Sequence, residues 1–189
     1  MKTVEPIRDI GKINQMISEL MKSGFRDYLL FAVGIGTGFR ISDILKLKVE
    51  DVKNKSHITI IEKKTKKLKE AFLYPDLKRN IDKYIINLSD NEYLFKSQKG
   101  TNKPISRVQA YRILSKAAKA IGLDSIGTHS LRKTFGYHHY KTNKDVAVLQ
   151  DLFNHSAPSV TLRYIGINKD VRDESVNNMF SNMGIEWEK

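Results

Sequence analysis

The stretch of sequence that decides the fold opens with Thr128-His129-Ser130-Leu131-Arg132 and closes with His155-Ser156-Ala157-Pro158-Ser159-Val160-Thr161-Leu162-Arg163-Tyr164. His129 and Arg132 lie three residues apart, so a helix capped by Thr128 would place both on one face. The N-terminus of a helix presents unpaired N–H groups and a partial positive charge, so a phosphate docked there would meet the dipole, the imidazole and the guanidinium together. We therefore interpret this stretch as a phosphate-handling site, with the rest of the chain assembled around it.

The charge of the whole chain favours a polyanion as partner. The 189 residues carry a formal net charge of +12, and the pI is about 9.7. Residues 165–189 hold three basic and five acidic side chains, a net charge of −2, so residues 1–164 carry +14. Clustered Lys and Arg supply the salt-dependent phosphate affinity of nucleic-acid-binding proteins. The positive charge therefore belongs to the body of the chain, and the tail has a different role.

Several classes of protein and of site are excluded by what the sequence lacks. It has no cysteine, which rules out disulfides, thiolate metal sites and a thiol nucleophile. No apolar run reaches the ~18 residues of a membrane span, and residues 1–6 lack the apolar core of a secretory signal. We therefore expect no membrane contact and a cytoplasmic location. The five histidines show no metal-ligand spacing, and the G-x-S-x-G motif of a serine hydrolase is absent, so we expect neither of those sites.

The spacing of apolar residues predicts one mainly helical domain. Residues 9–21 are amphipathic, and residues 25–35 are apolar nearly all round, which is typical of a buried helix. Further helices are predicted over residues 75–86, after the N-cap residue Ser106, and over residues 145–153.

The strands are predicted in the first half of the chain. Two β-branched runs, residues 57–62 and 68–74, indicate a β-hairpin, and Tyr93-Leu94-Phe95 is predicted to add a third strand. The expected fold class is therefore mainly α with a small three-stranded antiparallel β-sheet.

The connection of this hairpin is rich in lysine. Between the two runs lies Lys63-Lys64-Thr65-Lys66-Lys67. A solvated hairpin tip is one interpretation, because lysines are common on surfaces. The other is a tip that reaches into DNA, where an ammonium acts as a point charge or a proton donor.

Two other groups of basic residues are candidates for phosphate contact. A glycine-containing turn, residues 34–38, places Arg40 at the start of a short helix, where a surface ion pair is the plainer alternative. The helix after Ser106 is predicted to bury a stripe formed by Val108, Tyr111, Leu114, Ala118 and Ile121. Its other side carries basic residues that would suit a DNA backbone or groove, although ordinary solvation explains them as well; they are Arg107, Arg112, Lys116 and Lys119.

Taken together, these residues resemble the catalytic domain of the tyrosine recombinases, or phage-type integrases. The resemblance spans about residues 5–180 in the order and spacing of that family. Its elements are Arg40 within G-x-G-F-R-I-S-D, Lys64 in the hairpin, His129-x-x-Arg132, His155, and Tyr164 nine residues later. Any one of these elements is weak evidence for the family, whereas six in order on a basic, cysteine-free chain are strong evidence.

The resemblance implies a site-specific recombinase that breaks and rejoins double-stranded DNA. Tyr164 would attack the scissile phosphate, form a 3′-phosphotyrosyl link and free a 5′-hydroxyl. A phenol has a pKa of about 10, so such a tyrosine needs cations and a base nearby. Arg40 and Arg132 would clamp the nonbridging oxygens and stabilise the charge of the transition state. Because two arginines can replace a metal, neither a metal nor another cofactor is expected.

The same resemblance assigns the proton transfers. Lys64 would protonate the leaving 5′ oxygen, His129 would assist proton transfer from the tyrosine, and His155 would hydrogen-bond the phosphate. The sequence departs from the family at Lys66, because similar proteins often have glycine after the Lys-Thr pair. Lys63, Lys66 and Lys67 are therefore near enough to compete with Lys64 for the role of general acid.

The resemblance also bears on domains and partners. We expect residues 1–189 to form a single catalytic domain, with a body over residues 1–164, and the N-terminal core-binding domain of the family to be absent from this chain. Residues 165–189 would form an acidic helix and tail. In the family such a segment docks on a neighbouring protomer, which implies a homo-oligomer, a tetramer on DNA; packing back on its own domain is the alternative.

Two other functions stay open at the level of sequence. One is a non-catalytic DNA-binding protein with the same fold. The other is a type IB topoisomerase, which shares the phosphotyrosine chemistry but relaxes supercoils without partner sites. The resemblance implies DNA recombination, including DNA integration, in the service of a mobile element, with the direction of the reaction, integration or excision, left open.

Overall fold

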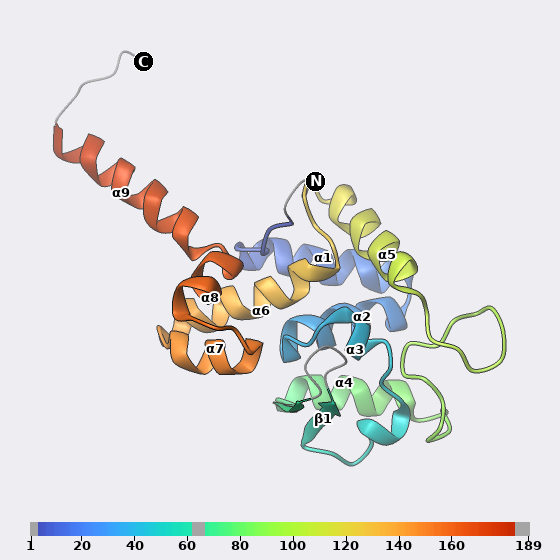
Figure 1. The fold of residues 1–189 in the computed structure, drawn as a ribbon. Coiled ribbons are helices and arrows are strands. Elements are labelled where there is room, and N and C mark those ends of the chain that lie inside the picture. Colours follow the sequence, from blue (N-terminus) through green and yellow to red (C-terminus); the bar gives the residue numbers. More distant parts are fainter. Residues whose placement is uncertain (1–3, 62–66, 184–189) are drawn as a thin grey trace.

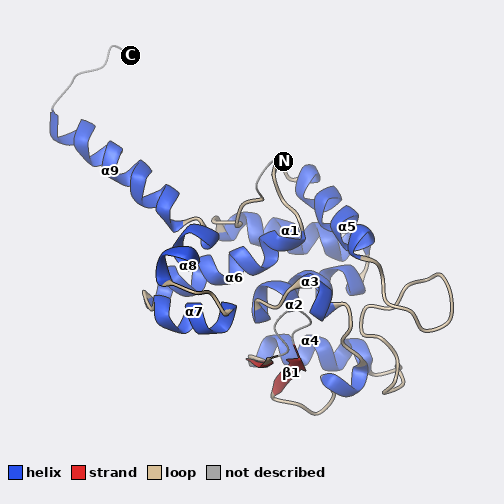
Figure 2. Ribbon diagram, in the orientation of Figure 1, coloured by secondary structure: helices blue, strands red, loops and turns tan. Residues whose placement is uncertain are grey.

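The structure is a computed structural model that describes residues 4–61 and 67–183, and it is mostly helical (Figures 1 and 2). Lys63, Lys64 and Lys66 lie outside the described residues. None of the helices within the described ranges combines the length and the apolar character needed to cross a membrane. The elements in chain order are α1 (Ile10–Ser23), α2 (Phe25–Thr37), α3 (Ile41–Ile44), the short 3-10 helix η1 (Val49–Asp51), β1 (His57–Ile61), β2 (Leu68–Phe72), α4 (Pro75–Ile85), α5 (Arg107–Ala120), α6 (Thr128–Asn143), α7 (Val146–Phe153), α8 (Pro158–Ile165) and α9 (Ile167–Met183).

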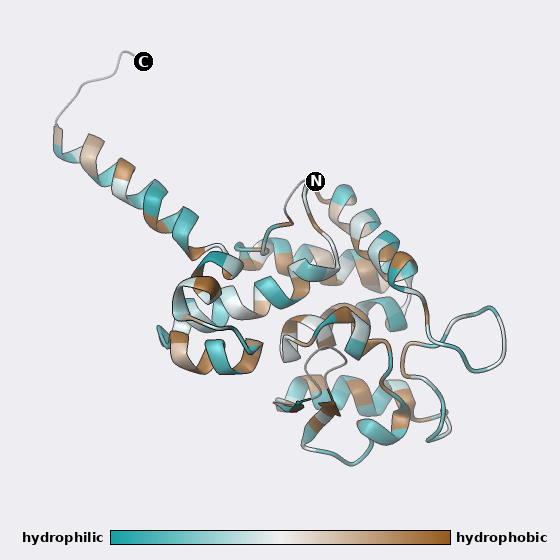
Figure 3. Cartoon of the chain, in the orientation of Figure 1, coloured by the Kyte–Doolittle hydropathy of each residue, from teal (hydrophilic) through white to brown (hydrophobic). Residues whose placement is uncertain are grey.

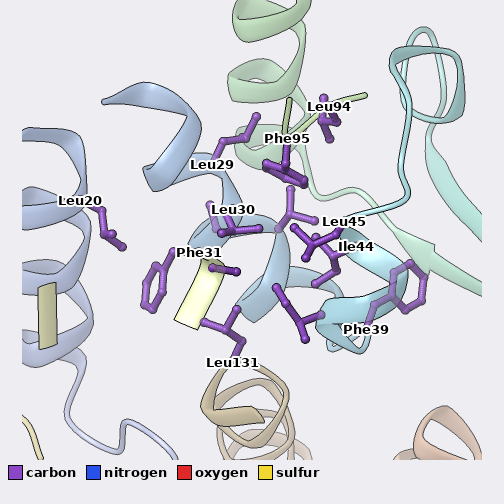
Figure 4. Packing of buried hydrophobic residues seen from close by; sticks show 14 of the residues in the cluster. Leu20, Leu29, Leu30, Phe31, Phe39, Ile44, Leu45, Leu94, Phe95 and Leu131 are labelled. Atoms are coloured by element: carbon purple, nitrogen blue, oxygen red, sulfur yellow. The ribbon is translucent and has the colours of Figure 1, made fainter. Parts of the chain in front are cut away.

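Helix α2 lies at the centre of the fold. It packs against α1, α3, α4 and α6, which explains why its sequence is apolar nearly all round. Leu29, Leu30 and Phe31 are fully buried. Figure 4 shows them in one cluster with Leu20 of α1 and Leu131 of α6, so helices from both halves of the chain share one core. The predicted buried helix is confirmed, and it continues two residues further than expected, to Thr37.

A close helix crossing places the first turns of α6 directly on α2. A Cβ atom at Gly34 would lie 2.4 Å from Cδ1 of Leu131, so only glycine allows this approach. Leu131 is buried and lies between His129 and Arg132 in the sequence. The contact therefore fixes the helix turn that carries both candidate site residues.

A second, smaller core holds α6, α7 and α8 together. It is formed by Tyr137, Leu149, Phe153, Ile165 and Ile167. Gly136 makes this packing close, because a Cβ atom there would lie 2.6 Å from Ile165 and 2.7 Å from Phe153. The last turn of α8, which carries the candidate nucleophile Tyr164, is thereby fixed against α6.

Helix α9 extends away from this body (Figure 1). Arg8 holds its first turn, because Nε of Arg8 donates to Oδ1 of Asp170 at 2.9 Å. Residues 171–183 are all exposed, and the colours of Figure 3 show hydrophobic and hydrophilic residues interspersed along this helix. Up to residue 183, the last one described before the C-terminus, the segment therefore does not pack back on the body.

The sheet has two strands in the described residues, and the predicted third strand is wrong. β1 pairs antiparallel with β2, from His57 opposite Phe72 to Ile61 opposite Leu68. The run Tyr93-Leu94-Phe95 makes only an isolated bridge with Lys48. Leu94 and Phe95 are fully buried, so the apolar character of this run places it in the core and does not indicate a strand.

Two lysines join the hairpin to the end of α7. Nζ of Lys69 donates to the backbone oxygens of Leu152 and, at 3.3 Å, of Asp151. Nζ of Lys67 donates to Oδ1 of Asn154 at 3.1 Å. The last carbonyl groups of a helix lack partners within the helix and carry partial negative charge, so they attract cations. The hairpin is thus docked beside the chain segment that leads to His155.

Two details of the predicted helices are corrected. In α5, Val108 and Tyr111 are exposed, and the buried face is formed by Ala110, Leu114, Ala117 and Ala118. Small alanines fit the close contact with neighbouring helices, whereas the sequence pattern gave weight to the larger apolar residues. In α6 the N-cap is Gly127 instead of Thr128, because the hydroxyl of Ser130 accepts from the backbone N–H of Gly127 at 3.1 Å.

The crossing of α2 and α6 generates a prediction for stability. Gly34→Ala forces a methyl group into the Leu131 side chain, so we expect the free energy of unfolding to fall by about 1–3 kcal/mol. For a chain of this length the melting temperature should drop by roughly 2–10 °C in a thermal unfolding scan. Gly11→Ala is the matched control, since a Cβ there meets only the flexible side chain of Asp9. A melting temperature that is the same for Gly34→Ala and wild type would contradict this packing.

Candidate active site

Arg132 is the most buried of the candidate residues. Its exposed fraction is 3%, and its guanidinium lies 4.1 Å from the centroid of the Phe153 ring. Nη1 donates to the backbone oxygen of Gly38 at 2.6 Å, and Nη2 donates to the backbone oxygen of Phe153 at 3.1 Å. Both acceptors lie at helix C-termini, where backbone oxygens lack helical partners. The guanidinium of α6 therefore joins the ends of α2 and α7.

Tyr164 and His129 face each other across α8 and α6. The hydroxyl of Tyr164 lies 3.5 Å from Nδ1 of His129, a long hydrogen-bond distance. The Tyr164 ring also meets the rings of His155 and Phe153 edge to face, with centroids 5.2 Å and 5.7 Å away. A base within this reach of a phenol can accept its proton once substrate tightens the site.

The surroundings of Tyr164 act on its acidity in opposite directions. Burial raises the pKa of Tyr164 above its ordinary value, because a phenolate loses hydration. The positive charges of Arg132 and Arg40 lower the pKa in turn, and a hydrogen bond with Arg132 acts in the same sense. The net shift is upward, so Tyr164 rests as a neutral phenol with cations already in place for its ionised form.

Both site histidines are shifted toward the neutral form. Burial lowers the pKa of His129, and the charges of Arg132, Lys133 and Arg40 lower it further. Burial, Arg132 and Arg40 likewise lower the pKa of His155. A neutral imidazole has one nitrogen that accepts a proton or a hydrogen bond.

His155 is oriented by its own segment. Its Nδ1 lies 3.0 Å from Oγ1 of Thr161, a fully buried side chain of α8. Asn154, just before it, ends α7 in the left-handed conformation with φ of 51°. This turn reverses the chain so that His155 comes back beside Tyr164.

Arg40 approaches from the other half of the chain. It is the N-cap residue of α3 and is partly exposed. Together with His129 and Arg107 it lines a hollow of about 720 Å³. Its positive charge helps to lower the pKa of His129 and of His155, and it opposes the upward shift in the pKa of Tyr164.

The structure thus brings five predicted site residues together: Arg40, His129, Arg132, His155 and Tyr164. The sixth, Lys64, lies outside the described residues, together with Lys63 and Lys66. Of the further basic residues, Lys67 is exposed beside Asn154, and Arg107 lines the hollow. Arg112 and Lys116 are exposed further along α5. Within residues 4–61 and 67–183, no three His, Asp or Glu side chains gather in a way that could hold a metal ion.

Sequence reasoning missed two lysines near the site. Lys69 holds the end of α7, as described above, and Lys133 lies over the ring of Tyr164 with Nζ 5.3 Å from its centroid. For Lys133 the position directly after Arg132 gave no signal, because adjacent residues of a helix point in different directions and Tyr164 lies on another helix. For Lys69 no local signal exists, since its acceptors are more than eighty residues away.

Comparison with known proteins shows similarity to one family. The pattern that defines the phage integrase family matches residues 8–170. The chain is similar to the probable integrase/recombinase YoeC of Bacillus subtilis strain 168, with 54% identity over 170 residues that cover 90% of this chain and 93% of YoeC. It is also similar to the tyrosine recombinase XerA of Pyrococcus furiosus, with 27% identity over 177 residues. This match covers 91% of the chain and 62% of XerA.

Solved structures show the same fold. The crystal structure of a XerA recombinase has a TM-score of 0.74 at 20% identity, and the match covers 99% of this chain and 66% of that one. A XerH recombinase bound to its difH substrate has a TM-score of 0.68 at 20% identity, covering 86% of this chain and 50% of that one. The mainly helical architecture is therefore that of a tyrosine recombinase catalytic domain, and the chain belongs to the phage integrase family of tyrosine recombinases.

Proposed function

We propose that this tyrosine recombinase breaks and rejoins double-stranded DNA with Tyr164 as its nucleophile. The observation that carries the proposal is the meeting of the Tyr164 hydroxyl with Nδ1 of His129, 3.5 Å apart, beside the buried guanidinium of Arg132. A nucleophile, a base and a fixed cation are the groups that attack on a phosphate requires.

The first step is transfer of the phosphate to the enzyme. The phenol oxygen of Tyr164 attacks the scissile phosphorus as its proton passes toward His129. The bond between phosphorus and the 5′ oxygen breaks, which leaves a 3′-phosphotyrosyl link and a 5′-hydroxyl. Rejoining is the reverse, with the 5′-hydroxyl of a partner strand as nucleophile. The energy of the phosphodiester bond is kept in the phosphotyrosyl link, so the two reaction steps need no ATP.

The arginines would stabilise the negative charge that builds on the phosphate. Arg132 suits this role because two backbone oxygens hold its guanidinium before substrate binds, so no reorganisation is needed during the reaction. Arg40 would approach the same phosphate from the N-terminus of α3, and His155 would donate a hydrogen bond to it.

The general acid is assigned to the hairpin. We propose that Lys64 protonates the leaving 5′ oxygen, with Lys63, Lys66 and Lys67 as its competitors. Support comes from the docking of β2 beside the site, where Lys69 and Lys67 hold the end of α7.

The DNA would lie along the basic body of the chain. Residues 1–164 carry a net charge of +14, and Arg107 shares a hollow with Arg40 and His129. Arg112 and Lys116 would extend this surface along α5. Contacts of this kind neutralise phosphates and release counterions, which positions the duplex without reading its sequence.

Assembly on DNA would use α9. This helix leaves Val171, Val176, Met179 and Phe180 exposed on a segment that extends from the body. Exposed apolar side chains on such a segment favour a protein partner, and a second copy of the chain is the partner that recombination between two DNA sites requires. We propose a homo-oligomer on DNA, a tetramer when two sites are paired.

The nucleophile is tested with nicked duplexes that lose a short strand after cleavage and so trap the covalent product. Wild-type protein should yield a protein–DNA adduct on denaturing gels, and Tyr164→Phe should yield none while binding DNA as before. Tyr140→Phe, on α6, is the control and should form the adduct. An adduct that persists in Tyr164→Phe would exclude this nucleophile, and a wild type without adduct on any duplex would exclude the enzymatic function.

The pH dependence of cleavage follows from His129. Because its pKa is lowered, the neutral form that accepts a proton persists below the usual value of about 6.5. The single-turnover cleavage rate should therefore stay level from pH 8 to about 6.5 and fall only at lower pH. His129→Gln should react slowly and without this acid limb. A rate that is already halved at pH 7 in wild type would show that another group titrates.

The role of α9 in assembly is tested by placing negative charge on its exposed apolar positions. The double change Val176→Glu and Met179→Glu should reduce the mass of the assembly on a duplex with two sites, measured by analytical ultracentrifugation. Cleavage of a single-site trapping duplex should stay within about twofold of wild type, since α9 carries none of the site residues. Asn177→Glu with Asn178→Glu adds the same charge at polar positions and should leave the assembly intact. An unchanged assembly in the first variant would refute the role of this helix.

A further inference from the structure

Lys133 is a buried lysine that faces the candidate nucleophile. Its exposed fraction is 8%, and its Nζ lies 5.3 Å from the centroid of the Tyr164 ring. Among residues 4–61 and 67–183 no hydrogen bond or ion pair takes up this ammonium. Burying a charge without such a partner costs free energy, and the face of an aromatic ring offsets only part of that cost.

Two lysines of α6 lie over tyrosine rings, and only Lys133 is both buried and placed over Tyr164. Lys141 of α6 also lies over a tyrosine ring, that of Tyr137, with Nζ 5.9 Å from the centroid. Lys141 is exposed, whereas Lys133 is buried and its ring belongs to the residue beside His129. The two pairs share their chemistry and differ in burial and in the tyrosine involved, so one serves as the control for the other.

We propose that Lys133 is a positioning residue for cleavage, which steadies the ring of Tyr164 and stabilises the negative charge that develops on it during attack. The inference rests on the proposed role of Tyr164 as nucleophile. A phenolate ring is richer in electrons than a phenol ring, so a cation over its face gains attraction as the proton leaves. An interaction that strengthens toward the transition state raises the rate of the chemical step.

Lys133 takes no part in the transfer of protons or bonds. The phenol proton leaves toward His129, the oxygen of Tyr164 forms the bond to phosphorus, and the bond to the 5′ oxygen breaks. Burial lowers the pKa of Lys133, with the charge of Glu5 opposing the shift and that of Arg8 adding to it. The charged and titratable groups around the pair are Glu5 and Arg8 from the N-terminal segment, His129 and Arg132 from α6, Arg40 before α3, and His155 before α8.

The test compares single-turnover cleavage of a trapping duplex by variants. Lys133→Met keeps the length of the side chain without its charge and should cleave about tenfold more slowly, as expected for a desolvated cation over a ring. Lys133→Gln should do the same, because the charge is what matters. Neither change should weaken DNA binding or lower the melting temperature, since removal of a buried charge does not destabilise the core. Lys141→Met should cleave at the wild-type rate.

A second measurement separates charge stabilisation from mere packing. A fluorinated tyrosine at position 164 has a more acidic phenol and needs the cation less. It should therefore narrow the difference in rate between Lys133→Met and wild type. A difference that stays the same with the fluorinated residue, or Lys133 variants that cleave at the wild-type rate, would overturn the inference.

The outcomes also distinguish this inference from the proposed function. If wild type forms an adduct that Tyr164→Phe loses, and Lys133→Met cleaves normally, only the role of Lys133 fails. If wild type forms no adduct, or Tyr164→Phe keeps it, the proposed nucleophile fails first and the role of Lys133 falls with it.

Discussion

The structure depends on one buried cation, the guanidinium of Arg132, held between the backbone oxygens of Gly38 and Phe153. Gly38 ends α2 in the left-handed conformation, with φ of 65°, and Phe153 is the last residue of α7. A buried charge that loses its acceptors is strongly destabilising, so these two helix ends must meet for α6 to pack as it does. The packing of these helix ends against α6 is therefore also what fixes the arginine in the site.

The electrostatics of the site point to a resting state that awaits a phosphate. Several cations surround Tyr164, yet burial keeps its phenol neutral and lowers the pKa of both neighbouring histidines. The charges of Arg132 and Arg40 both favour the ionised form of Tyr164. A DNA phosphate would meet an arginine that two backbone oxygens already hold in place.

The closeness of five candidate site residues could be predicted from the sequence better than parts of the fold. The three-residue spacing of His129 and Arg132 acts within one helix turn, so it survives any error in tertiary structure. The prediction of a third strand was wrong because Tyr93-Leu94-Phe95 is an apolar run that contributes to the core and makes only an isolated bridge. The predicted buried face of α5 was wrong because alanines, and not Val108 and Tyr111, pack against the neighbouring helices. The contacts of Lys69 and Lys133 arise only when distant segments pack, which no local pattern reports.

The central claim is that Tyr164, and not another of the eight tyrosines in the chain, becomes linked to DNA. Mass spectrometry of the covalent adduct after digestion with nuclease and trypsin tests it most directly. Trypsin cleaves after Arg163 and Lys169, so the nucleotide should be found on the peptide Tyr164-Ile165-Gly166-Ile167-Asn168-Lys169. A nucleotide on a peptide that contains any other tyrosine would contradict the account.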